Sequence, residues 1–117
     1  MSYVECFVAP VPASHQEDYI AHASKAVEIF RAHGAVRVVE NWESEIPDGE
    51  LTSFPLAVRR GEGEKIVLGW VEWPSRAARD EGMKAAMAQM QEEMRDMPMP
   101  FDGKRLIFGG FDTILEA

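Results

Sequence analysis

The segment Lys65–Trp73 (KIVLGWVEW) constrains the fold of this chain more than any other part of the sequence. Its β-branched and aromatic residues, followed by Pro74, predict a β-strand. Side chains of a strand alternate between its two faces, and here both faces are apolar. One face carries Ile66, Leu68 and Trp70, and the other carries Val67, Val71 and Trp73. A sheet built around this strand must therefore be covered on both sides.

Three further strands and two helices are predicted around this strand. The expected strands are residues 3–9, 35–43 and 105–115, and the expected helices are residues 15–33 and 76–95. Ser14 and Glu17 have the spacing of a capping box at the start of the first helix, and Gly34 is a typical left-handed stop after it. Ser75 is a favourable N-cap for the second helix. Residues 10–12 (PVP) are expected to close the first strand, because proline donates no hydrogen bond to a ladder.

The order of these elements is β-α-β-(β)-β-α-β, which predicts an α+β ferredoxin-like βαββαβ fold with an antiparallel sheet and both helices on one face. The bracketed β stands for residues 51–60 (LTSFPLAVRR). Pro55 in this segment favours an edge strand or an arm over a central strand. A chain of 117 residues has room for one core, so we expect a single domain over residues 1–117.

The helices of this plan cover only one face of the sheet, so the other face should be polar if it met water. The strand at 65–73 is apolar on both faces, and exposing its large side chains would forfeit about 1.5–3 kcal/mol each. A second copy of the sheet, packed face to face at about 10 Å, is the simplest cover. The sequence therefore predicts a homodimer that associates through its sheet faces.

Charge excludes several kinds of partner. The chain has 12 basic and 20 acidic residues, a net charge of −8, so an anionic membrane or an extended duplex would be repelled. Arg59, Arg60 and Lys65 form too small a basic patch to favour nucleic acid. The single cysteine, Cys6, excludes an intrachain disulfide, and the first residues lack the pattern of an export signal. We expect a cytoplasmic protein with no nucleic-acid or membrane partner.

Four stretches of the sequence resemble a known family. They are residues 46–49 (IPDG), 52–55 (TSFP), 69–75 (GWVEWPS) and 99–111 (MPFDGKRLIFGGF), and they are similar to the YbaA-like family of bacterial domains of unknown function. The resemblance implies a dimeric α/β-barrel fold, shared with antibiotic-biosynthesis monooxygenases, haem-degrading monooxygenases and small stress-induced dimeric proteins. It implies no reaction and supplies no functional residues.

Familiar catalytic and cofactor motifs are absent from the sequence. Residues 61–66 (GEGEKI) open like a phosphate-binding loop, but they lack the third glycine and carry two glutamates. His15, His22 and His33 lie on the first predicted helix without the carboxylate or cysteine spacing of a zinc site. Cys6 alternates with valines in a strand, which is typical of a buried and inert thiol. We expect neither a metal nor a cofactor.

Charged residues inside predicted strands point to a candidate site. They are Glu5, Arg37, Glu40, Glu72 and Arg105. Each must be paired, exposed at an edge or functional, because an unpaired buried charge costs several kcal/mol. Glu72 lies between Trp70 and Trp73, and a carboxyl beside indole rings is suited to general acid or base chemistry. The alternative role for Glu72 is an ion pair with an arginine at a rim or an interface.

We therefore expect any pocket to contain Trp42, Trp70 and Glu72, with Arg79 or Arg105 as the anchor for an anionic substituent. A stripe of methionines at 83, 87, 90, 94 and 97 either fills the core or lines such a pocket. Two hypotheses stay open. The chain is a homodimer that binds a small apolar or aromatic molecule in a pocket between the helices and the sheet, as a metal-free oxygenase-like or isomerase-like enzyme, or it is a non-catalytic structural or stress-related dimer.

Overall fold

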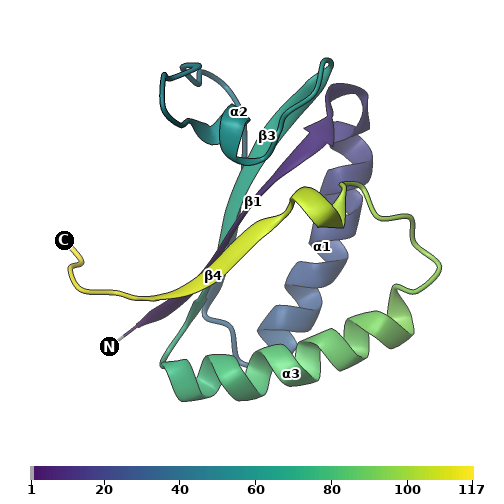
Figure 1. Ribbon diagram of the computed structural model, residues 1–117. Coiled ribbons are helices and arrows are strands. Elements are labelled where there is room, and N and C mark those ends of the chain that lie inside the picture. Colours follow the sequence, from purple (N-terminus) through teal and green to yellow (C-terminus); the bar gives the residue numbers. More distant parts are fainter. Residues whose placement is uncertain (1) are drawn as a thin grey trace.

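The computed structural model describes residues 2–117 as a four-stranded antiparallel sheet with two long helices on one face (Figure 1). The strands are β1 (Tyr3–Pro12), β2 (Arg37–Trp42), β3 (Glu64–Trp73) and β4 (Ile107–Asp112), in the sheet order β2-β3-β1-β4. The helices are α1 (Gln16–Ala32), α2 (Phe54–Ala57) and α3 (Arg76–Glu93), with short 3-10 turns η1 (Ala13–His15) and η2 (Gly103–Arg105). The predicted α+β fold class and the two helices on one face are confirmed.

The first strand is longer than predicted, because Pro10 and Pro12 do not end it. Both prolines stay in register with β3, opposite Ile66 and Glu64. The N–H of Ala13 points to the β3 side of the strand and donates to the carbonyl of Gly63. Backbone N–H directions alternate along a strand, so the nitrogens of Pro10 and Pro12 point away from β3. On that side β4 pairs with β1 only as far as Val8. The missing donors therefore fall where no strand needs them.

The start of the first helix also differs from the prediction. Ser14 lies in η1, α1 begins at Gln16 after His15, and no side-chain hydrogen bond caps it. The capping box of Ser14 and Glu17 is therefore not formed, because η1 shifts the helix start past the serine. The end of the helix follows the prediction, since Gly34 has a φ of 107°.

Residues 51–60 form neither an edge strand nor an extended segment. They belong to an arm, defined here as residues 43–60, which contains α2 and lies on the side of the sheet away from α1 and α3 (Figure 1). The hydroxyl of Ser53 accepts a hydrogen bond of 3.1 Å from the Leu56 N–H, and Pro55 occupies the first turn of α2. Proline tolerates that position because the N–H it lacks has no partner there. Of the two predicted alternatives for residues 51–60, an edge strand or an arm, the structure supports the arm.

An ion pair holds the base of the arm. The Arg60 guanidinium contacts the carboxylate of Glu43, whose other oxygen accepts a hydrogen bond of 2.9 Å from the Ile66 N–H. Desolvation raises the pKa of Glu43, but the hydrogen bonds from Arg60 and Ile66 outweigh it and leave the pKa below its usual value. Both ends of the arm are thereby tied to β3.

The core lies between the helices and the sheet. Tyr3, Val71 and Trp73 form one buried cluster at the end of the sheet nearest α3. Gly82 brings α3 close to that cluster, because a Cβ there would lie 2.2 Å from the Trp73 ring and 2.7 Å from the His33 carbonyl oxygen. Ser75 caps α3 as predicted, accepting a hydrogen bond of 3.1 Å from the Ala78 N–H.

The methionine stripe is only partly buried. Met94 is buried, Met83 and Met90 are half-buried, and Met87 and Met97 are exposed. The core role therefore applies to part of the stripe.

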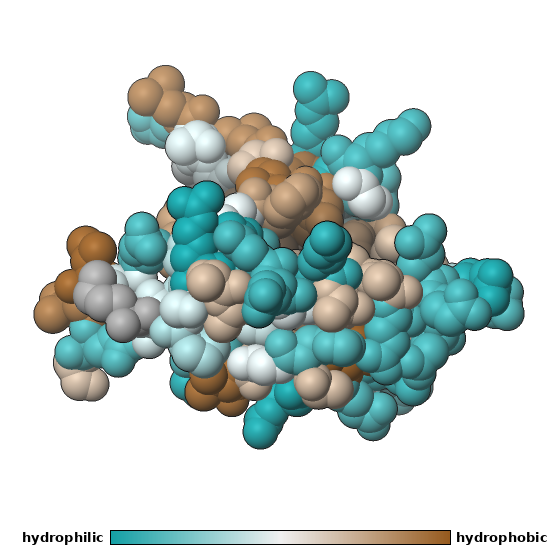
Figure 2. All heavy atoms as spheres, turned by 90° about the horizontal axis from the view of Figure 1, so that it is seen from below, coloured by the Kyte–Doolittle hydropathy of each residue, from teal (hydrophilic) through white to brown (hydrophobic). Residues whose placement is uncertain are grey.

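The face of the sheet that points away from α1 and α3 is called the open face. Apart from the buried Pro10 and Ile66, its apolar residues are Val4, Cys6, Val8, Val39, Leu68, Trp70, Ile107 and Phe111. Ile107 and Phe111 are exposed and the others are half-buried. Figure 2 shows hydrophobic atoms projecting where the arm and the C-terminal segment lie, whereas the opposite end of the molecule is mostly hydrophilic. The apolar open face that the sequence predicts is present.

Candidate functional site

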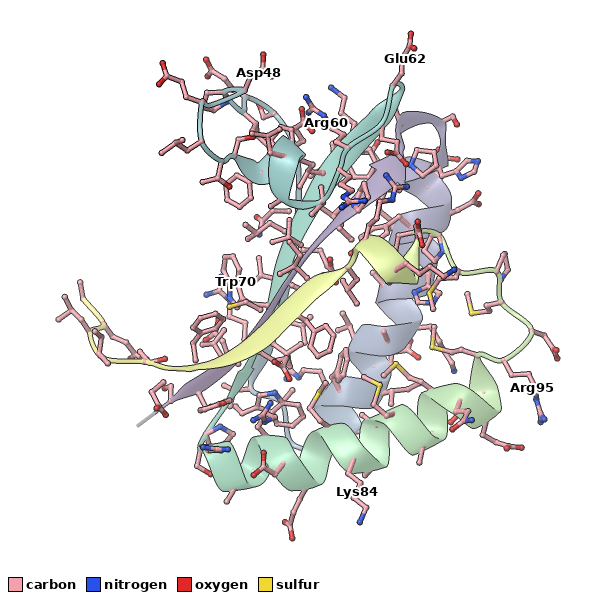
Figure 3. All side chains as sticks on the ribbon, viewed as in Figure 1. Asp48, Arg60, Glu62, Trp70, Lys84 and Arg95 are labelled. Atoms are coloured by element: carbon pink, nitrogen blue, oxygen red, sulfur yellow. The ribbon has the colours of Figure 1, made fainter. Side chains whose placement is uncertain are left out.

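The expected pocket of Trp42, Trp70 and Glu72 does not form, because the two tryptophans lie on opposite faces of the sheet. Trp42 pairs with Val67, which faces the helices, whereas Trp70 pairs with Val39 on the open face. Residues paired across two strands share a face, and neighbours along a strand alternate. Figure 3 shows Trp70 on the side of the sheet away from α1 and α3. Register therefore separates Trp42 from the other two residues.

Trp70 and Glu72 do interact on the open face. The indole Nε1–H of Trp70 donates to the Glu72 carboxylate at 2.9 Å, and an Arg37 guanidinium nitrogen lies 3.6 Å from the same oxygen. The Arg37 side chain is 67% exposed and that of Glu72 30% exposed. This geometry matches the alternative of an ion pair at a rim, and an acid–base role for Glu72 stays a prediction.

The two proposed anion anchors already have carboxylate partners. Arg79 donates to Glu5 at 2.9 Å and to the Tyr3 hydroxyl at 3.1 Å, and its guanidinium lies 4.7 Å from the centre of the Tyr3 ring. Arg105 donates to both oxygens of Glu64 at 2.8 Å. Either guanidinium would have to exchange its protein partner for a ligand, so an anchoring role for them also stays a prediction.

A second pair of titratable groups lies on the helix side, where the sequence predicted a pocket but named neither of these two residues for it. The Tyr19 hydroxyl, on α1, donates to the Glu40 carboxylate, on β2, at 2.6 Å. The Tyr19 side chain is buried, whereas Glu40 keeps an exposed portion at the edge of the sheet. Gly69, beside Glu40 on β3, makes room for the pair, because a Cβ there would lie 2.9 Å from a Glu40 oxygen. One Glu40 oxygen is thus held by tyrosine, and the other has no partner among the hydrogen bonds of residues 2–117.

Aromatic rings surround this pair. The Tyr19 ring centre lies 6.5 Å from that of Trp42 and 6.3 Å from that of Phe101, and His22 meets Phe101 edge to face at 6.4 Å. These distances are typical of stabilising tilted aromatic contacts. Trp42 therefore belongs to this cluster rather than to the one expected from the sequence.

The surroundings shift the titration of three groups. Desolvation raises the pKa of Glu40 above its ordinary 4.5, and the hydrogen bond from Tyr19 opposes that rise. Desolvation, then the Glu40 charge, raises the pKa of Tyr19, so the phenol keeps its proton. Desolvation lowers the pKa of His22, which favours a neutral imidazole. The arrangement offers a carboxylate that takes up a proton more readily than an exposed one, beside a fixed hydroxyl donor.

Sequence reasoning singled out Glu40 but not its partner. Glu40 stood among the charged residues inside strands, whereas Tyr19 was only one apolar position of the helix predicted over residues 15–33. Twenty-one positions separate them, and only the packing of α1 on β2 brings them together. The available signal was Glu40 itself, a charge on the helix-facing side of a strand, which requires a partner from a helix.

Two adjoining hollows lie under the arm, and together they are called the arm groove. One of about 460 Å³ is lined by Ile46, Pro47, Phe54 and Ala57, among others. The other, of about 250 Å³, shares Ile46 and Phe54 and reaches Trp42, Ile66 and Leu68. The groove is mostly apolar and sits at the end of the open face where β3 begins.

Residues 2–117 contain no group of three histidine, cysteine or acidic side chains placed to hold a metal ion. Within the same residues, no helix has the length and apolar character needed to cross a membrane. Burial, then the charge of Glu5, raises the pKa of the Cys6 thiol, which favours its protonated, unreactive form.

Comparison with known proteins places these features in a family. Residues 2–103 match the model described as "Protein of unknown function (DUF1428)". The chain is 42% identical over 116 residues to the uncharacterized protein YbaA of Escherichia coli strain K12, with 99% of each chain covered.

Solved structures share the fold at much lower identity. A dimeric ferredoxin-like protein from an uncultured marine organism superposes with a TM-score of 0.61 at 10% identity, over 99% of this chain and 98% of the other. A monooxygenase of Streptomyces coelicolor, in complex with the ligand Nanaomycin D, gives 0.55 at 15% identity over 99% and 93%. These likenesses establish the ferredoxin-like fold.

Proposed function

The chain belongs to the DUF1428 family of proteins of unknown function, and from this premise we propose that it is a homodimer that binds a small molecule beside Tyr19 and Glu40. The dimer forms through the open face, and each subunit carries its own Tyr19–Glu40 pair on the helix side. The observation that carries the binding site is the 2.6 Å hydrogen bond that fixes the Glu40 carboxylate.

The open face supports the dimer. Its eight apolar side chains stay partly or fully exposed in a single chain, and covering a large one is worth about 1.5–3 kcal/mol. Arg37 and Asn41 lie on the same face along the edge strand β2, and Glu72 lies opposite Arg37 on β3. An apolar centre with a polar edge is the usual anatomy of a specific interface. A solved structure with this fold is described as a dimeric ferredoxin-like protein, which supports self-association.

The Tyr19–Glu40 pair supports a proton-transfer role. A ligand with an acidic O–H or C–H would give its proton to the unpartnered Glu40 oxygen, while Tyr19 continues to donate to the other. The rings of Trp42 and Phe101 favour a flat apolar or aromatic ligand. Proton abstraction is a step that isomerase-like and metal-free oxygenase-like reactions share. The likeness to a monooxygenase with a bound ligand is compatible with either reaction.

Replacing Tyr19 with phenylalanine is expected to raise the pKa of Glu40 further, because the hydrogen bond that opposes desolvation is lost. Carbon-13 NMR of the glutamate carboxyls during a pH titration measures the change. Tyr3→Phe is the matched control, because Tyr3 contacts Arg79 instead and should leave Glu40 unchanged. An unchanged Glu40 titration in Tyr19→Phe would show that the hydroxyl does not tune this carboxyl.

The same shift has a consequence for stability. A carboxyl with a raised pKa binds its proton more tightly in the folded state, so its contribution to stability falls as the pH rises from 4.5 through the folded pKa. Glu40→Gln removes this fall and should gain stability relative to the wild type between pH 4 and pH 7. Denaturant unfolding at the two pH values measures that gain.

A non-catalytic dimer is the alternative. It is favoured because neither hollow of the arm groove is lined by Tyr19 or Glu40, so neither supplies a ligand cavity for that pair. Native mass spectrometry of protein purified from its own host separates the two. We expect a species at twice 13.1 kDa that carries an additional small-molecule mass. A dimer with no added mass, also after incubation with host metabolite extract, would favour the non-catalytic alternative.

A further inference from the structure

The C-terminal segment, residues 113–117, leaves the sheet with two of the most exposed apolar side chains in the protein. Ile114 is 89% exposed and Leu115 is 86% exposed. The segment starts at a fixed point, because the Thr113 N–H donates to the Ser2 carbonyl oxygen at 3.1 Å. Figure 1 shows it extending on the side away from α1 and α3, the side on which the arm also lies. Both features therefore face whatever covers the open face.

The segment cannot reach the arm groove of its own chain. Its last strand residue, Asp112, is level with Tyr3, whereas the groove residue Ile66 is level with Pro10. These levels are seven residues apart along β1, which is about 23 Å at 3.3 Å per residue. Leu115 lies three residues past Asp112 and reaches about 11 Å at most. A C-terminal segment that occupies the groove must therefore come from a second copy of the chain.

The groove offers the matching surface. Phe54, 45% exposed, stands at the junction of the two hollows, and Ile46, Ile66 and Leu68 line the walls. A two-fold axis that lies between the two sheets, perpendicular to the line from the C-terminal segment to the arm groove, turns one sheet end for end over the other. That operation brings the end of the sheet with the C-terminal segment of one subunit over the end with the arm groove of its partner.

We propose that residues Ile114 and Leu115 of each subunit dock into the arm groove of the second copy in the dimer. The inference rests on the proposed homodimer and adds to it a definite orientation, in which each subunit gives its C-terminal segment and receives that of the other. The arm, held at its base by Glu43 and Arg60, is thereby a clamp on the partner chain. The exchange buries apolar side chains that a single chain leaves in water.

Cysteine crosslinking between differently labelled chains tests the orientation. Cys6→Ser removes the native thiol, and Phe54→Cys and Leu115→Cys are then made in separate chains. After subunit exchange, a short bis-maleimide should crosslink the mixed sample but neither variant alone. Ile20→Cys, on the solvent side of α1, replaces Phe54→Cys as the negative control. Crosslinking of Phe54→Cys with itself would place arm against arm and overturn the proposal.

The double variant Ile114→Asp, Leu115→Asp gives a second readout. It should weaken the dimer on the order of 100-fold without unfolding the subunit, because both side chains are exposed in the single chain. Analytical ultracentrifugation over a concentration series measures the dissociation constant, with Ile20→Asp as control. A monomeric wild type would remove the proposed dimer itself. A dimeric wild type whose affinity is unchanged in the double variant, and which gives no crosslink, would remove only the exchange.

Discussion

Replacing Val8 with lysine is expected to convert the dimer into a folded monomer. Val8 lies on the central strand β1, opposite Leu68 on one side and Ile107 on the other, so it sits within the open face. In a single chain the lysine can extend into water from this half-buried position. In the dimer the ammonium group would be buried without a partner. Because the two subunits are related by symmetry, the dimer would bury two such groups. We expect a loss of about 4 kcal/mol of association energy, or about 1,000-fold in the dissociation constant.

Size-exclusion chromatography with light scattering at micromolar concentration measures this effect. The wild type should have twice the chain mass of 13.1 kDa, and Val8→Lys should have that mass once, with an unchanged circular dichroism spectrum. Ile20→Lys is the matched control, because it places the same charge on the helix side of the sheet at a residue that is 56% exposed. A Val8→Lys protein that is still dimeric would exclude the open face as the interface.

Replacing Arg79 with methionine is expected to destabilise the fold by about 3 kcal/mol or more. Glu5 is buried at the centre of the helix-facing side, and one of its carboxylate oxygens contacts Arg79 at 2.9 Å. The other oxygen is buried without a hydrogen-bond partner within residues 2–117. Methionine fills most of the arginine volume but leaves the carboxylate charge unpaired in a desolvated place. The penalty therefore comes from Glu5 and not from lost packing.

A double-mutant cycle isolates that penalty. Glu5→Gln removes the charge, so adding Arg79→Met to it should cost much less than Arg79→Met alone. Arg76→Met is the matched control on the same helix, because its side chain is 71% exposed and its partner Asp80 is 4.0 Å away. Such an exposed pair is worth well under about 1 kcal/mol. If Arg79→Met leaves urea unfolding unchanged but abolishes binding of a co-purified ligand, Arg79 anchors that ligand and does not serve the fold.

For the candidate site, the sequence could predict which types of residue stand out but not which of them meet. Glu40 was visible as a charge inside a strand and Trp42 as a pocket candidate, whereas Tyr19 was only an apolar helix position; their partnership depends on which strand edge α1 packs against. Trp42 and Trp70 were expected to share a pocket with Glu72. The register between β2 and β3 assigns them to opposite faces, and a shift of one residue would have reversed that outcome. Sequence spacing within each strand does not reveal the offset between two strands.

The predictable part of the fold was larger. Periodicity located both long helices, and Ser75 and Gly34 marked the start of one and the end of the other. The same reasoning failed at Ser14, where a 3-10 turn displaced the helix start, and at residues 51–60, where Ser53 and Pro55 favoured a short helix. At both places the same local residues are compatible with more than one conformation, so local preference alone is a weak guide.

The sequence by itself determined the element order and the two apolar faces of β3, because side-chain alternation and helical periodicity are properties of neighbouring residues. Only the tertiary structure decided that the arm covers Ile66 but leaves Trp70 half-buried, and that Tyr19 holds Glu40. These contacts join residues far apart in the chain. Their geometry follows from strand register and helix packing, which no local pattern encodes.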